Sequence, residues 1–116
     1  MIEDKVLDFL SAKMSVPVYM EIPKNPPVRM IVLEKTGGGL DSKVINTSVI
    51  AAQSYGKSLY DAAQLNNELK AAVFDGIDGL ISLDDVLRVE LNSDYNFTDT
   101  TTKKYRYQMI FVVTHY

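Results

Sequence analysis

Few residues in the sequence combine the side-chain types and spacing that catalysis requires. The adjacent acids Asp84 and Asp85 carry groups suited to acid-base or metal chemistry, but neighbours in sequence point apart and no second polar cluster lies nearby. His115 is the single histidine and cysteine is absent, so a zinc site would depend on carboxylates and a Ser-His-Asp triad on the penultimate residue. We therefore expect no enzymatic activity, metal or cofactor, a solvated turn at the two acids, and a surface position for His115.

A run of three glycines is the sharpest change of composition in the chain. A phosphate-binding P-loop ends in Gly-Lys-Ser/Thr and opens a helix, whereas Leu40-Asp41-Ser42 leads toward a segment of strand character. The run therefore predicts a mobile hairpin loop and not a nucleotide site. The residues of this predicted loop are Lys35, Thr36, Gly37, Gly38, Gly39, Leu40 and Asp41.

The stretch Lys103 to Tyr107 alternates basic and aromatic residues, a pattern that holds single-stranded nucleic acid by charge and stacking. Its two tyrosines share a strand face with Met109 and Phe111, which favours a place in the core, with the lysines protecting an exposed strand. The formal net charge of -3 also provides no overall positive field. We expect no specific nucleic-acid binding, and a small nucleic-acid-binding module remains an alternative.

Two segments have the periodicity of amphipathic helices. From Ile2 to Met14, apolar residues recur at steps of three and four, with acids in the first turn and a lysine in the last. The second helix begins after Ser58, which with Asp61 forms a capping signature, and ends near Asp75. Its apolar stripe is expected to pack on a sheet and comprises Leu59, Ala62, Ala63, Leu69, Ala72 and Val73.

Five segments have strand character, and a long loop of polar residues is expected from Ser93 to Thr102. The strands are Val16 to Ile22, Val28 to Glu34, Lys43 to Gln53, Val86 to Asn92 and Lys104 to Tyr116. Val28 to Glu34 is almost continuously apolar, which indicates a central strand covered on both faces. In Val86 to Asn92, the period of two places Leu87, Val89 and Leu91 on one face.

With 116 residues, the chain is expected to form one domain, residues 1–116, with a single modest core. No basic leader with an apolar core opens the sequence, and no apolar run approaches the roughly 20 residues of a membrane-spanning helix. We therefore expect a soluble protein. The order α-β-β-β-α-β-β predicts an α+β fold, with a mixed, mostly antiparallel sheet flanked by two principal helices.

Three segments carry a resemblance that spans almost the whole chain. They are the strand that ends in Glu34-Lys35-Thr36-Gly37-Gly38, the segment Ala51 to Ser58 before the Ala-rich helix, and Leu91 to Tyr95 with the later strand Lys104 to Val113. Together they resemble the tail-terminator, or tail-completion, proteins of long-tailed bacteriophages and prophages. The resemblance implies a structural virion protein that forms a six-fold ring at the head-proximal end of the tail tube, stops tube growth and joins the tube to the head neck.

The resemblance also implies partners and a location. The partners would be further copies of the chain, the tail tube protein and a head neck or connector protein, with no membrane involved. The protein would lie in the virion tail, and in the host cytoplasm before assembly. The loop Lys35 to Asp41 would make the ring or tube contacts, becoming ordered when a neighbour covers it. Another neck component, such as a head-completion or adaptor protein, remains the nearest alternative.

Overall fold

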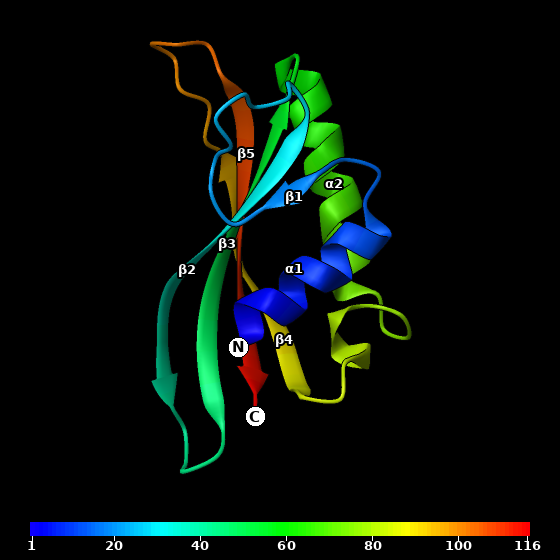
Figure 1. The fold of residues 1–116 in the computed structure, drawn as a ribbon, viewed down its shortest axis with the longest axis vertical. Helices are drawn as coiled ribbons and strands as arrows, with labels where there is room; N and C mark the ends of the chain where they lie inside the picture. Colours follow the sequence, from blue (N-terminus) through cyan, green and yellow to red (C-terminus); the bar gives the residue numbers. More distant parts are fainter.

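A five-stranded sheet with both helices against one face forms the architecture in the computed structural model, which describes residues 1–116 (Figure 1). The elements are α1 (Ile2–Lys13), β1 (Val18–Tyr19), β2 (Met30–Leu40), β3 (Asn46–Gly56), α2 (Leu59–Phe74), the short 3-10 helix η1 (Leu80–Ser82), β4 (Val86–Asn96) and β5 (Tyr105–His115). This order confirms the predicted α+β class with two helices and the sequence α-β-β-β-α-β-β. Neither helix is long and apolar enough to cross a bilayer.

The strands lie in the order β1-β2-β3-β5-β4. Only β1 and β2 run parallel, and the other three neighbouring pairs are antiparallel, so the predicted mixed, mostly antiparallel sheet is confirmed. The central strand is β3, not β2 as the apolar run Val28 to Glu34 predicted. β2 is covered on both faces over Met30 to Leu33, but its outer neighbour β1 has two residues only. Prolines after β1 remove ladder donors and keep that strand short.

The main core fills the space between the helices and one face of the sheet. α1 contributes Ile2, Val6, Phe9 and Leu10, α2 contributes Leu65, Leu69 and Val73, and the sheet contributes Ile31, Leu33, Ile50, Ala52, Met109, Phe111 and Val113. The packing of α2 on the sheet is as predicted, but its stripe is shifted. Leu59 is 40% exposed, while Leu65 and Asn66 are buried, because the helical period places residues 62, 65, 66, 69 and 73 toward the sheet.

Two irregularities change the predicted faces of β4. The register shifts between Val86 and Arg88 and again between Leu91 and Ser93. Each bulge inserts an extra residue and so resets the alternation of side chains. Val86 and Val89 therefore turn toward the core, whereas Leu87, in the first bulge, is 39% exposed. The prediction that Leu87, Val89 and Leu91 share one face is wrong for Leu87. Val89 and Leu91 stay in register opposite Val113 and Phe111 and share a face, although Leu91 is 44% exposed.

The polar stretch after Asn92 is strand as far as Asn96, where a long loop was predicted. Asp94 explains this, because its carboxylate accepts a hydrogen bond from Asn66 Nδ2 and pairs with Lys70, both on α2. The helix thus supplies polar partners that keep a polar segment in the sheet. The loop itself is limited to residues 97–104.

His115 is buried, which contradicts the predicted surface position. Its Nδ1 lies 2.9 Å from the carbonyl oxygen of Tyr116, and its Nε2 lies 2.7 Å from Ser48 Oγ. A main-chain oxygen only accepts, so Nδ1 donates its proton to Tyr116, while Nε2 and the Ser48 hydroxyl share a hydrogen bond. Ser48 stands opposite β5 in the ladder and is 1% exposed, and this partner, distant in sequence, allows the imidazole to lie inside.

Candidate assembly surfaces

The segment Lys35 to Asp41, predicted as a loop, is mostly strand. Lys35 to Leu40 belong to β2 and pair with β3 from Ile50 back to Asn46, with one irregularity between Lys35 and Gly37. The prediction of a loop is wrong, because β3 presents the β-forming residues Thr47 and Val49 opposite Gly39 and Gly37 and holds the glycines in the ladder. The turn lies further along the chain, where the amides of Asp41 and Ser42 donate to the carbonyl of Ile45.

We call Lys35–Leu40 together with Asn46–Ile50 the hairpin arm. It extends past both helices at one end of the molecule (Figure 1). β1 pairs with Ile31 and Val32 alone, so no strand lies along the outer edge of β2 from Leu33 to the tip. Such an edge presents unpaired N–H and C=O groups and is a template for pairing with another chain.

The glycines of the hairpin arm differ in the space around them. A Cβ atom added at Gly38 would lie 2.9 Å from the carbonyl oxygen of Thr47, whereas one at Gly39 would meet nothing within 4 Å. At Gly37 the nearest atom would be Val49 Cγ2 at 3.7 Å, an ordinary contact. Gly38 therefore permits a close approach of backbone, and Gly39 faces open space where a side chain is tolerated.

β4 forms the other edge of the sheet, and it is guarded. Its two bulges interrupt the regular row of backbone groups, and Arg88 Nε lies 2.9 Å from Glu90 Oε1 on its surface. Bulges and charged side chains are devices that discourage strand addition. The two edges are thus chemically different, and the edge on the hairpin arm is the more open one.

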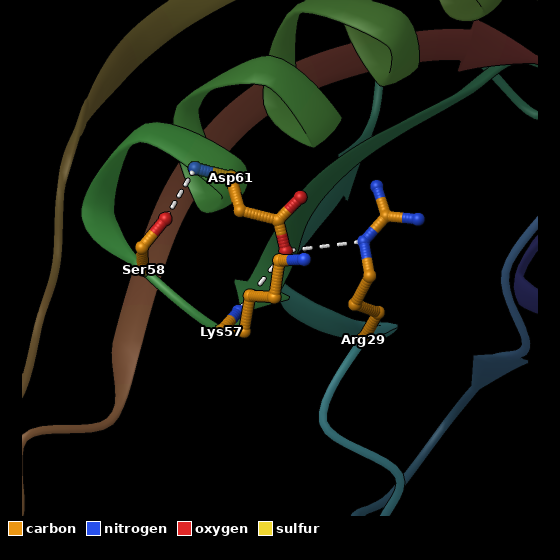
Figure 2. Close-up of polar contacts among 4 residues, drawn as sticks. All are labelled: Arg29, Lys57, Ser58 and Asp61. Atoms are coloured by element: carbon orange, nitrogen blue, oxygen red, sulfur yellow. Dashed lines mark hydrogen bonds and ion pairs between the residues drawn. The ribbon is translucent and has the colours of Figure 1, made fainter.

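A polar cluster fixes the start of α2 (Figure 2). Ser58 Oγ accepts from the Asp61 amide at 3.1 Å, as the capping signature predicted. Asp61 Oδ2 accepts from Arg29 Nε at 3.1 Å and from the Lys57 amide at 3.0 Å. The cluster ties the connection before β2 to the helix, because Arg29 precedes β2 directly. It thereby places Lys57 beside that proline-rich connection.

In the stretch Lys103 to Tyr107, the arginine is engaged within the molecule. The Arg106 guanidinium lies 4.5 Å from the centre of the Phe97 ring, and its Nη1 donates to Tyr55 Oη at 3.0 Å. The two tyrosines are half-buried, between the predicted core and the surface. Lys103 is exposed, and its φ of 53° is the only positive one at a residue other than glycine.

The paired acids do not combine into a site. Asp85 forms an ion pair with Lys5 of α1, and Asp84 is exposed. No group of three or more His, Cys, Asp or Glu side chains is placed to hold a metal ion.

No model of a known protein family matches the chain, and no curated protein matches it significantly.

Proposed function

We propose that the protein is a structural component of a long-tailed phage or prophage virion, where copies form a ring, six-fold as the resemblance implies, that caps the tail tube and joins it to the head neck. The observation that carries the proposal is the hairpin arm with its open edge on β2. Strand addition to such an edge gives affinity through backbone hydrogen bonds and needs no large apolar patch.

The differing edges of the sheet support a ring. A closed ring of more than two copies repeats a contact between two different patches, whereas a contact between identical patches stops at a dimer. In this chain the open edge lies on the hairpin arm alone, and the guarded edge on β4 does not duplicate it, so the arm is one patch of such a contact. The partners in this proposal are other copies, the tail tube protein and a neck protein, and the place is the virion tail.

A substitution at Gly39 tests the proposal. Gly39→Glu adds a charged side chain to the hairpin arm where a Cβ meets nothing within 4 Å, so the subunit should fold and melt as before. We expect a host in which this variant replaces the natural chain to produce tails of irregular length, or tails not joined to heads, in electron micrographs. Ser11→Glu is the matched control, since it adds the same charged side chain at an exposed position of α1, away from the hairpin arm.

Tails of normal length and normal attachment from a stable Gly39→Glu protein would contradict the role of the hairpin arm. Normal tails from a host that lacks the gene would contradict the proposed function as a whole. A tail tube gene beside this gene in the source genome would support it. Affinity for DNA that falls steeply with added salt would instead favour a nucleic-acid-binding module.

A further inference from the structure

A pocket of about 290 Å³ opens beside the N-terminal end of α2, next to the polar cluster of Figure 2. The proline-rich connection before β2 supplies much of its wall, and Ile22 and Val28 there are 50% and 64% exposed. We call this pocket the socket, formed by Ile22, Pro26, Pro27, Val28, Lys57, Lys103 and Lys104 among others. Its size lies at the lower end of ligand sites and suits one apolar side chain with its neighbours.

Three lysines line the socket, and no acidic residue does. None of Lys57, Lys103 and Lys104 has a carboxylate oxygen within 4.0 Å, although other cations of the chain are paired. Apolar anchors that enter a pocket and are surrounded by complementary polar groups are typical centres of protein interfaces. The complement of the socket is therefore an apolar side chain flanked by carboxylates.

The turn that follows α2 presents this complement. Ile77 is 83% exposed, more than any other large apolar side chain in the chain, and Asp75 and Asp78 flank it in sequence. We call Asp75–Asp78 the knob. It lies at the opposite end of α2 from the socket, about 24 Å away along a helix of 16 residues.

The knob is held rigidly by its own backbone contacts. Asp75 Oδ1 accepts from the amides of Ile77 at 2.8 Å and Asp78 at 2.9 Å, and the Gly79 amide donates to the carbonyl of Asp75 at 3.1 Å. A Cβ at Gly79 would lie 2.2 Å from that carbonyl oxygen, so the turn requires glycine there. Lys13 acts on Asp75 through its charge, while Asp78 makes no ion pair. A preformed turn loses little conformational entropy on binding.

We infer that the socket of one copy binds the knob of the next copy, with Ile77 in the apolar part and the two carboxylates against the lysines. The inference rests on the proposed function and deepens it, since contacts between opposite ends of α2 are heterologous and repeat around a ring. A second copy fits better than a nucleic acid. The net charge is -3, and Arg106 already stacks on Phe97. The two tyrosines of the socket wall are poor stacking platforms for bases, because Tyr55 is 5% exposed and Tyr105 is half-buried.

Ile77→Asp tests the contact in the purified full chain by sedimentation velocity over a range of concentrations. We expect the natural chain to self-associate and the variant to do so with a dissociation constant raised by about tenfold or more, since burial of the isoleucine is lost. The thermal melt should not change, because the side chain is 83% exposed in the single subunit. Leu91→Asp, on β4 and 44% exposed, is the matched control and should associate like the natural chain.

A charge exchange gives a sharper result. Lys104→Glu alters the socket alone, and Asp78→Lys alters the knob alone, so each variant by itself should associate more weakly. In an equal mixture, alternating copies pair an altered socket with an altered knob and a natural socket with a natural knob. We therefore expect the mixture to recover association that neither variant shows.

Three results would overturn the inference: a natural chain that stays monomeric at every concentration reached, no recovery in the mixture, or unchanged association by Ile77→Asp. Binding of single-stranded DNA that is lost in Lys104→Glu, with self-association unaffected by Ile77→Asp, would make the socket a nucleic-acid site. Normal tail termination by Ile77→Asp beside failure by Gly39→Glu would remove this contact and leave the proposed function standing. Association that depends on the knob, in a protein without which tails form normally, would support this contact and contradict the proposed function.

Discussion

Single aspartates shape two exposed turns of the molecule. At Asp99, the amides of Thr101 and Thr102 donate to Oδ1 at 2.9 Å and 3.3 Å, and these bonds hold the pKa of the carboxyl below its ordinary value. At Asp75, bonds from the amides of Asp78 and Ile77 lower the pKa in the same way. Each carboxylate is bonded more favourably in the folded chain than in the unfolded one, so each turn is linked to pH.

The sign of that linkage follows from the direction of the shift. A carboxyl whose pKa is lowered by folding contributes stability above its unfolded pKa, near 3.9, and loses it as pH falls through the folded value. We expect Asp99→Asn, which keeps an acceptor oxygen without a charge, to make the melting temperature fall less steeply below about pH 4. Thermal melts between neutral and acid pH measure this. The exposed Asp84→Asn serves as control, and an acid limb unchanged in Asp99→Asn would refute the linkage.

Among the elements, helix α2 connects the core to both the socket and the knob. It packs on β3 and β5 through Leu65, Leu69 and Val73, and its two ends carry the socket and the knob. Its N-terminus is capped by Ser58, and its position over the sheet is fixed further by Asn66 and Lys70. A helix held at this many points keeps the two surfaces at a fixed separation.

Two leucines of α2 test its packing by the same substitution. Leu69 is fully buried, so Leu69→Ala should lower the free energy of unfolding by roughly 2 to 5 kcal/mol. Leu59 is 40% exposed, and Leu59→Ala should cost under about 1 kcal/mol. Urea unfolding followed by circular dichroism measures both. Equal losses at the two positions would mean that the helix does not face the sheet as described.

Two glycines of the hairpin arm test the pairing of its strands, each by substitution with alanine. Gly39→Ala meets open space and reduces the freedom of the unfolded chain, so it should be neutral or raise stability by up to about 1 kcal/mol. Gly38→Ala places a methyl group 2.9 Å from the carbonyl oxygen of Thr47 and should lower stability instead. Differential scanning calorimetry of the two variants measures the difference. An alanine at Gly38 that is as stable as one at Gly39 would show that the arm is not paired as described.

For the whole molecule, the fold class and the order of elements follow from local sequence patterns. The placement of residues whose partners are distant in sequence does not. The Ser58 cap acts over three residues and was readable, and so was the order of helices and strands. The burial of His115 depends on Ser48, and the strand at Asp94 depends on α2. Neither partner is adjacent in sequence, so pattern alone misplaced both.

The candidate surfaces were predicted less well than the fold. The glycine run drew attention to the hairpin arm, but it suggested a loop, because composition cannot show that Thr47 to Val49 lie opposite. The lysines at 103 and 104 were noted in sequence, whereas their meeting with Lys57 and Val28 is a product of the tertiary structure. The knob carries a signal that could have been found: an isoleucine between two aspartates directly after a predicted helix.

The position of β5 at the end of the strand sequence determines when the sheet can form during synthesis. β5 pairs with β3 over the full length of both strands and with β4 on its other side, yet a ribosome synthesises it after every other strand. Until residues 105–115 have left the ribosome, β3 has an open inner edge and β4 has no strand to pair with. The nascent chain must therefore keep the hairpin of β2 and β3 from pairing with neighbouring nascent chains, and the sheet closes in one late step. Pairings this distant in sequence fold slowly, so a chain interrupted before Tyr105 should be recovered as aggregate, not as a smaller domain.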